Sequence, residues 1–395
     1  MAHVVMCWEL GADLGHVARM KPLAEALLRR GHRVSFIVRE ALSAERLLDA
    51  VRTPWFQAPY QSDAVPSPIV PTLSLPGVMH NTGFHDPRSL LARLHAWRNL
   101  YTALAPDLLV FDHSPTAMLA ARGLKVRRVV LGTGFGIPPA VYPMPGFDDS
   151  ATGLAAIEDR VTANANQALR ALGEAPLARL ADLYAADASL FFTLRELDHY
   201  AGRDAGDYWG PTRQDGGVAP AWPALPGRRV FAYLKPFKTL PALLDTFQQS
   251  GHPTLIYLGK GADETRARHA GAANLSFSDK PVDLKRAAAD ADLLVCHSGH
   301  GTISSALLAG KPLLLLPLNM EQRMLAQRVE QAGAGLAAPA LAPEGMHAKF
   351  QRLLAEPAFT AAARGFAERY SRLEVEHIPE RFAALAERLL ASEAP

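Results

Sequence analysis

A short apolar run that ends in a glycine-rich polar turn constrains the fold of this 395-residue chain most strongly. Residues 292–296 are suited to a strand that is buried on both faces, as in a parallel sheet. The turn over residues 297–302 follows, and its Gly299 and Gly301 let the backbone come close to a ligand. We expect a helix from about Thr302 to Ala309, with its unpaired N–H groups directed at the turn. Such a helix start is a good site for a diphosphate.

The size and composition of the chain indicate two domains and limit its partners. A chain of 395 residues is too long for one ordinary compact domain, and its 49% of hydrophobic residues supply a sizeable core. The net charge of +2 argues against a general nucleic-acid binder. The two cysteines, Cys7 and Cys296, cannot build a disulfide framework, and we expect both to be small buried core residues. No apolar run reaches transmembrane length and the N-terminus lacks the charged region of a signal peptide, so we expect a cytoplasmic protein.

Strands and helices alternate through the first half of the chain. Residues 4–8 and 33–38 predict buried strands, and residues 16–30 between them carry apolar side chains at helical spacing. A strand–helix–strand unit of this kind implies a parallel sheet. The other elements expected in this half are helices at 43–51, 90–105 and 150–171 and strands at 108–111, 128–131 and 189–193.

Two segments interrupt the alternation. Residues 53–87 hold seven prolines among aromatic side chains and predict a long irregular loop, which forms either an apolar wall for a ligand or a surface wrap. Residues 212–228 are rich in Gly, Pro, Asp and Arg, and predict a linker between domains. The second half then resumes, with further strands at 229–234, 254–258 and 275–277 and helices at 241–249, 283–289, 320–332, 345–355, 357–370 and 378–391.

The turn at 297–302 belongs to a longer pattern that resembles a known family. His297, Gly299, Gly301 and Thr302, followed by Gly310-Lys-Pro312 and Glu321-Gln322, are similar to the donor-sugar signature of nucleotide-sugar glycosyltransferases. The pattern resembles the family of plant flavonoid and bacterial macrolide or antibiotic glycosyltransferases, which is glycosyltransferase family 1-like. The similarity continues over residues 328–335 and also appears near the N-terminus.

This resemblance implies a fold and a reaction. The implied fold is α/β of the GT-B type: two facing Rossmann-like domains with parallel sheets, at 1–211 and 229–375, and a C-terminal helix within 376–395 that crosses back to the first domain. The implied reaction is inverting transfer of a sugar from a nucleoside-diphosphate sugar, with UDP or dTDP, to a hydroxyl of a small or lipid-like acceptor. No cofactor or metal is expected, because folds of this type usually need none and the sequence shows no suitable acidic or Cys/His spacing.

The N-terminal part of the pattern supplies a candidate base. Gly15-His16 stands between the first strand and the first helix, at the carboxyl edge of the expected sheet, where ligands bind in such folds. In the family, the histidine of this pair takes a proton from the acceptor hydroxyl. An imidazole suits that task, because its ordinary pKa of about 6.5 leaves it mostly neutral at pH 7. Asp112 matches the family's carboxylate partner, with His113 and Asp13 as alternatives, and a capping role is the other interpretation of His16.

The C-terminal part of the pattern is implied to bind the donor. There, hydrogen-bond donors stabilise the negative charge that develops on the diphosphate as its bond to the sugar breaks. The residues implied for the diphosphate are His297, Gly299, Gly301 and Thr302. Glu321 and Gln322 are implied to contact the sugar hydroxyls, although an acidic residue is common at the start of any helix.

The chain departs from the family pattern at two positions that bear on the donor. Lys235 follows a strand where the family has Gly-Ser, and we hypothesise that it supplies positive charge to the diphosphate, with a solvated surface lysine as the alternative. Ser305 stands where a glutamate usually grips the ribose. The sugar, the base and the acceptor therefore stay open.

Competing functions use the same scaffold. A non-catalytic nucleotide-sugar-binding protein would not need a base, and a nucleotide-sugar epimerase should carry more acid and base groups than His16 and Asp112. A lipid-like acceptor would bring peripheral membrane contact, for which the sequence shows no clear basic cluster. No nucleic-acid partner is expected, and the oligomeric state is open. Gly11-x-x-x-Gly15 is not the dinucleotide fingerprint, which disfavours a dehydrogenase.

Overall fold

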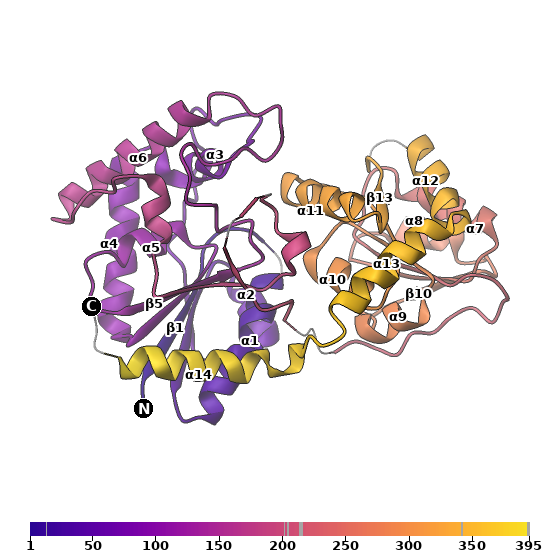
Figure 1. The fold of residues 1–395 in the computed structure, drawn as a ribbon, viewed down its shortest axis with the longest axis horizontal. Helices are drawn as coiled ribbons and strands as arrows, with labels where there is room; N and C mark the ends of the chain where they lie inside the picture. Colours follow the sequence, from indigo (N-terminus) through magenta and orange to yellow (C-terminus); the bar gives the residue numbers. More distant parts are fainter. Residues whose placement is uncertain (13, 201, 204, 213–215, 341–342, 393–395) are drawn as a thin grey trace. The chain divides into compact units, whose positions relative to one another are not determined.

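The computed structural model describes residues 1–12, 14–200, 202–203, 205–212, 216–340 and 343–392, which form two compact units (Figure 1). The first unit comprises Met1–Phe192, Tyr200–Thr212 and Glu374–Pro395, and the second comprises Thr193–His199 and Arg213–Leu373. The chain thus passes between the units four times. Residues 193–199, which the sequence placed within 1–211, lie in the second unit.

Each unit is built on one parallel sheet, which confirms the predicted α/β class. The first unit has the strand order β3-β2-β1-β4-β5-β6-β7. Its strands are β1 (His3–Trp8), β2 (Arg33–Val38), β3 (Trp55–Gln57), β4 (Leu108–Asp112), β5 (Arg127–Gly132), β6 (Ala188–Phe191) and β7 (Asp207–Tyr208). The central strands are buried on both faces, as their unbroken apolar runs predict.

Helices cover both faces of this first sheet. Successive side chains of each strand point to opposite faces, so the apolar side chains on both faces need a helix layer to bury them. Met6 and Trp8 of β1 pack in one core with α1 (Gly15–Arg29), α2 (Ala41–Leu47) and α14 (Ile378–Ala391). Val5 and Cys7 pack in another core with α4 (Pro87–Leu104), α5 (Pro115–Ala120) and α6 (Leu154–Ala171). The predicted return of the last helix to the first unit is therefore confirmed, and α14 runs beside α1 in Figure 1.

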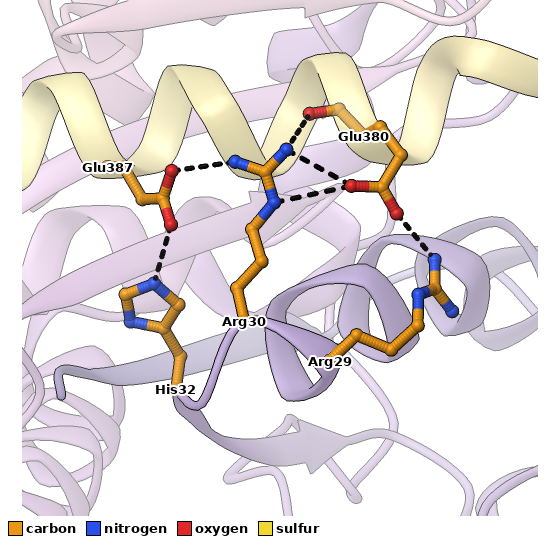
Figure 2. Close-up of polar contacts among 5 residues, drawn as sticks. All are labelled: Arg29, Arg30, His32, Glu380 and Glu387. Carbon is orange, nitrogen blue, oxygen red and sulfur yellow. Dashed lines mark hydrogen bonds and ion pairs between the residues drawn. The ribbon is translucent and has the colours of Figure 1, made fainter.

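Apolar packing and ion pairs together hold α14 on the first unit. Phe382 and Ala383 are fully buried in the core that α1 also lines. Figure 2 shows two carboxylates of α14, those of Glu380 and Glu387, with their partners Arg29, Arg30 and His32. Glu380 accepts from Arg29 Nη2 at 2.7 Å and Arg30 Nη2 at 3.1 Å, and Glu387 accepts from Arg30 Nη1 at 2.6 Å and lies 3.4 Å from His32 Nε2. These charged groups lie at the solvent-exposed border of the buried face, where ion pairs contribute little. The apolar contact therefore supplies most of the stabilisation, and the ion pairs fix how α14 is aligned along α1.

The second unit repeats the layered arrangement around six strands, in the order β10-β9-β8-β11-β12-β13. They are β8 (Val230–Leu234), β9 (Thr254–Leu258), β10 (Leu275–Ser278), β11 (Leu293–Cys296), β12 (Leu313–Leu315) and β13 (Gly335–Ala337). One face packs on α9 (Leu284–Asp290), α10 (His300–Leu308), α11 (Met320–Gln331) and α13 (Pro357–Arg369). The other packs on α7 (Leu240–Ser250) and α12 (Pro343–Ala355), and α8 (Asp263–His269) lies against α7.

The structure corrects several sequence expectations. The segment 53–87 is not one irregular loop: it contains β3, the helix α3 (Leu75–Met79) and a π-helical turn, η1 (His80–Phe84). Its Phe84 is fully buried in the core with α4, so this ring packs the fold rather than forming a ligand wall. Neither α5 nor α8 was predicted, because α5 is buried throughout and α8 is almost entirely polar, and neither shows an amphipathic period.

The two cysteines are buried and unpaired, as predicted. Each lies in a core strand, β1 or β11, and burial raises the pKa of the Cys296 thiol to about 12. Such a thiol is inert at neutral pH. Among the residues that the structure describes, no helix is both long enough and apolar enough to cross a bilayer.

Removal of the two α14 carboxylates should loosen this helix above pH 4. Hydrogen bonds from Arg29 and Arg30 lower the pKa of Glu380, and those from Arg30 and His32 lower the pKa of Glu387. A carboxylate with a lowered folded pKa stabilises the folded chain above its unfolded pKa of about 4.3, and this effect is lost as the pH falls through the folded value. We expect amide hydrogens of α14 to exchange about two- to fivefold faster in E380Q/E387Q than in the wild type at pH 7.

The control is Glu25→Gln, which removes an exposed pair with Lys21 on α1 at 3.9 Å and should leave the exchange of α14 unchanged. The unfolding temperatures of wild type and double variant should converge once the pH falls below the lowered folded pKa values of Glu380 and Glu387, where the carboxylates are protonated in both states. Equal exchange in α14 of wild type and double variant at pH 7 would show that these ion pairs do not hold the helix.

Candidate functional site

His16 lies in the first turn of α1, at the carboxyl edge of the first sheet. Its ring stacks on Trp8 at the end of β1, with centroids 5.0 Å apart and planes 18° apart. Its Nδ1 is 3.1 Å from Oδ2 of Asp112. The sheet register explains this contact, because Trp8 and Asp112 are direct partners at the ends of the neighbouring parallel strands β1 and β4. The side chain of His16 is 17% exposed, so the ring is partly open to solvent.

Asp112 has a second partner that the sequence did not reveal. Arg19 Nη1 donates to the same Oδ2 at 2.5 Å. Burial alone would raise the pKa of Asp112, but the charges of Arg19 and His16 outweigh it and hold this pKa below its usual value. Asp112 is therefore ionised at neutral pH and accepts a hydrogen bond from His16 Nδ1, which leaves a lone pair on Nε2 of the neutral ring. The only sequence signal for Arg19 is its position three residues after His16, on the same side of α1.

The loops around His16 fix the ring and leave Nε2 close to a glycine. The turn after β4 is tied to β1, because Ser114 Oγ donates to Cys7 O at 2.9 Å and Leu10 N donates to His113 O at 3.0 Å. Gly11 has φ +89°, and a Cβ there would lie 2.6 Å from His16 Nε2. Only glycine lets this loop pass so close to the ring.

The alternatives to Asp112 as the partner of His16 were His113 and Asp13. The His113 ring lies edge-on to His16, with centroids 6.2 Å apart, and it also contacts Phe135, with centroids 5.9 Å apart. Asp112, by contrast, contacts His16 Nδ1 directly, at 3.1 Å. Asp13 lies outside the described residues.

A buried carboxyl group stands next to this constellation and was also missed by the sequence. Glu9 is 1% exposed, and its Oε2 accepts from Thr116 N at 2.8 Å at the start of α5. Burial raises the pKa of Glu9, against the opposing effects of the Thr116 hydrogen bond and the Arg93 charge. Arg93 in turn donates to the carbonyls of Thr82 and Gly83 in η1. This pair ties β1, η1, α4 and α5 together and supports the strand that ends at Trp8.

In the second unit, the predicted phosphate ligand His297 is clamped between backbone carbonyls. Its Nδ1 is 2.8 Å from Leu316 O and its Nε2 is 3.1 Å from Lys235 O, and Phe237 packs edge-on against the ring. Both contacts are hydrogen bonds at once only when both ring nitrogens carry a hydrogen. The ring therefore ties the end of β11 to the ends of β8 and β12, and contact with a phosphate would require it to give up one carbonyl.

The glycine-rich turn ends in α10, which begins two residues earlier than predicted. Gly299 is the N-cap residue, and, its chain neighbours aside, no atom of the described residues lies within 4 Å of a Cβ built on it. Gly301 and Thr302 lie in the first turn of α10, where backbone N–H groups have no partner within the helix. His300, the first residue of α10, was not predicted; its Nε2 is 2.8 Å from Thr193 Oγ1.

Glu321 and Gln322 lie in the first turn of α11, which starts after the N-cap residue Asn319. Asn319 accepts from Gln322 N at 2.9 Å, and Gln322 Oε1 accepts from Leu318 N at 2.7 Å. The Gln322 oxygen therefore serves the helix start, and its amide N–H₂ is the group that it could offer a ligand. The Glu321 side chain is 46% exposed, and its Oε1 is 4.0 Å from Nε2 of the buried His199.

Lys235 directly follows β8, as predicted, and its side chain is exposed. Its stem lies beside the turn after β9, because a Cβ at Gly259 would be 3.7 Å from Lys235 Cγ. Ser305 is half-buried on α10. Within the described part of the chain, no group of three His, Cys, Asp or Glu side chains is placed to hold a metal ion.

Comparison with known proteins shows sequence similarity to glycosyltransferases over part of the chain. Residues 254–373 match the glycosyltransferase family 28 C-terminal domain. A PGL/p-HBAD biosynthesis glycosyltransferase of Mycobacterium tuberculosis (strain ATCC 25177 / H37Ra) is 38% identical over 86 residues, which are 21% of this chain and 20% of that protein. Aklavinone 7-beta-L-rhodosaminyltransferase of Streptomyces galilaeus is 38% identical over 100 residues, which are 25% of this chain and 22% of that protein. The matches thus span about a fifth of the length of these curated relatives.

The whole chain is similar in fold to solved glycosyltransferases. Spinosyn rhamnosyltransferase SpnG has a TM-score of 0.70 and 20% sequence identity, over 99% of this chain and 100% of SpnG. SpnG has also been solved in complex with thymidine diphosphate. The resemblance inferred from residues 297–322 is confirmed, since they lie within the matched domain. The chain therefore has the GT-B fold of glycosyltransferases such as SpnG, and its residues 254–373 are similar to the family 28 C-terminal domain.

Proposed function

We propose that this chain is an inverting glycosyltransferase that moves a sugar from a nucleoside-diphosphate sugar to an acceptor hydroxyl, with His16 as the general base. The observation that carries the proposal is the contact of His16 Nδ1 with the ionised Asp112, which directs the lone pair of Nε2 away from the carboxylate. The fold shared with SpnG and the family match over residues 254–373 support the same reaction class.

The base step follows from the surroundings of His16. The acceptor hydroxyl gives its proton to Nε2 as its oxygen forms a bond to the anomeric carbon and the bond from that carbon to the diphosphate breaks. A single displacement of this kind inverts the anomeric configuration. Asp112 stabilises the imidazolium that forms, and Trp8 keeps the ring in plane through its stacking contact. Gly11 leaves room at Nε2, because any larger residue would fill that space.

The donor is assigned to the start of α10 and its neighbours. The diphosphate leaves with additional negative charge, and the first-turn N–H groups at Gly301 and Thr302, with the positive end of the helix, stabilise it. Gly299 permits close approach, and Lys235 supplies a positive charge from the end of β8. His297 and the pair Glu321 and Gln322 are assigned to the phosphates and to the sugar hydroxyls.

The donor base that we propose is uracil or thymine, and the acceptor is a small or lipid-like molecule with a hydroxyl group. Thymidine diphosphate is bound in a solved structure of SpnG, and the curated relatives include a rhodosaminyltransferase named for aklavinone. The buried thiols of Cys7 and Cys296 fit a reducing cytoplasm as the place of the reaction.

Replacement of His16 by alanine should abolish transfer and spare donor binding. We expect UDP or dTDP to stabilise wild type and H16A equally, by about 2.7 kcal/mol at a hundred times Kd. Transfer from UDP- and dTDP-sugars to a panel of phenolic and polyketide alcohols, followed by mass spectrometry, should fall at least about a hundredfold in H16A. His347→Ala, at an exposed position of α12, is the control. Transfer retained by H16A would refute the assignment of the base, and nucleotide binding without transfer by the wild type would indicate a sensor.

Removal of the Arg19 charge should shift the acid limb of the pH–rate profile. Arg19 lowers the pKa of Asp112 and shares its Oδ2 with the imidazole. In Arg19→Met this lowering is lost, so the pKa of Asp112 rises and the carboxylate that holds the His16 ring becomes protonated at a higher pH. The acid limb of kcat/KM should therefore move to higher pH by about one unit. Arg19→Lys keeps the charge, so its acid limb should move by no more than about half of that shift. An acid limb of R19M at the same pH as in the wild type would show that Arg19 does not influence the base.

Loss of the Lys235 charge should weaken donor binding. We expect Lys235→Ala to raise the KM of the nucleotide sugar about fivefold to tenfold, because one charge-assisted contact with the diphosphate is lost. Lys238→Ala, which removes an exposed lysine three residues further on, is the matched control and should leave the KM unchanged. Initial rates at varied donor concentration measure both, and equal KM values in K235A and the wild type would make Lys235 a surface residue only.

A further inference from the structure

We propose that His300 is a further donor-binding residue, which offers a second imidazole to the diphosphate, and that Thr193 is the residue that positions it. This inference rests on the proposed function and assigns two residues to its donor site. Neither residue belongs to the motif positions from which that site was inferred, since His300 lies between the motif residues Gly299 and Gly301.

The place of His300 in α10 directs its side chain toward the start of the helix. His300 is the first helical residue, directly after the N-cap Gly299. Side chains in an α-helix tilt toward its N-terminus, so the imidazole reaches over the same backbone groups that we assign to the diphosphate. The adjoining Ser298 is 1% exposed, and its hydroxyl has no hydrogen-bond partner among the described residues. This turn therefore carries a buried polar group that a bound anion could satisfy.

Thr193 fixes one nitrogen of the imidazole. Its Oγ1 is 2.8 Å from His300 Nε2 and 3.4 Å from Leu194 O. When the hydroxyl donates to the Leu194 carbonyl, its oxygen accepts from Nε2–H, and this sets the rotation of the ring. We assign the other nitrogen, Nδ1, to a phosphate oxygen, which it can contact as a donor when it is protonated. Thr193 is fully buried, so water does not compete for this contact.

The segment that carries Thr193 is anchored within the second unit. Leu194 and Leu197 are buried in the same core as Ile303 of α10. Arg328 of α11 donates from Nε to Asp198 O at 2.8 Å and from Nη2 to His199 O at 3.3 Å. The Thr193 hydroxyl is thus held on packed structure, and ordering His300 against it costs little further entropy on donor binding.

The same segment also reaches the second donor motif. At its other end, His199 is fully buried and its Nε2 is 4.0 Å from the carboxylate of Glu321. The carboxylate of Glu196, in the middle of the segment, accepts hydrogen bonds from Arg369 and Tyr370 of the second unit. Residues 193–199 therefore lie beside the starts of both α10 and α11, although the strands before and after them, β6 and β7, belong to the first unit.

The test uses four variants of the full chain: His300→Ala, Thr193→Val, Thr193→Ser and the double variant T193V/H300A. We expect H300A to raise the Kd of UDP or dTDP, by calorimetry, and the KM of the donor about tenfold or more. T193V keeps the side-chain shape and should raise both about fivefold, whereas T193S restores the hydroxyl and should restore most of the affinity. The double variant should be no weaker than H300A, because Thr193 acts through His300.

The outcomes separate this inference from the function on which it rests. If the wild type binds the nucleotide and transfers sugar while H300A and T193V keep its Kd and KM, the assignment of His300 is overturned and the proposed function stands. If T193V and H300A lower only the unfolding temperature, their contact merely docks the segment on α10, which also overturns the assignment. If the wild type binds neither UDP nor dTDP, the proposed function and this inference fall together.

Discussion

Parallel strands that end at one edge of a sheet are the constraint on which this molecule depends. Residues that directly follow neighbouring strands must lie close together, however far apart they are in the sequence. In the first unit, the paired ends of β1 and β4 bring Trp8 and Asp112 to His16. In the second unit, the ends of β8, β11 and β12 meet at His297, which contacts the carbonyls of Lys235 and Leu316. Both candidate sites are therefore consequences of sheet register rather than of local loop structure.

The surroundings of three imidazoles differ, and this difference underlies the roles that we propose for them. His16 faces an ionised carboxylate, which suits a group that must become positively charged during a reaction. His297 faces two carbonyl oxygens, which hold a ring in place. His300 contacts a neutral, buried hydroxyl through Nε2, which holds that ring nitrogen in place. His16 and Arg19, both on α1, share Oδ2 of Asp112 at the end of β4, and their charges together keep the pKa of Asp112 low.

The sequence predicted the strands and the first helix well, because unbroken apolar runs and helical spacing are local signals. It also brought His16 and Asp112 together, through the family resemblance. Contacts made across the chain left no such signal: Arg19 is 93 residues from Asp112, and Thr193 is 107 residues from His300. His300 was hidden inside a recognised motif at a position that carries no pattern. The burial of Phe84 likewise could not be inferred from a proline-rich segment, because it depends on the packing of η1 against α4.

The account stands on one central claim: the start of α10 binds a diphosphate. A crystal structure of the chain with UDP or dTDP tests it most directly. The account predicts diphosphate oxygens within hydrogen-bonding distance of the first-turn N–H groups of α10, at Gly301 and Thr302, and of the His300 ring. A nucleotide bound at another place, with the first turn of α10 free of phosphate, would contradict it.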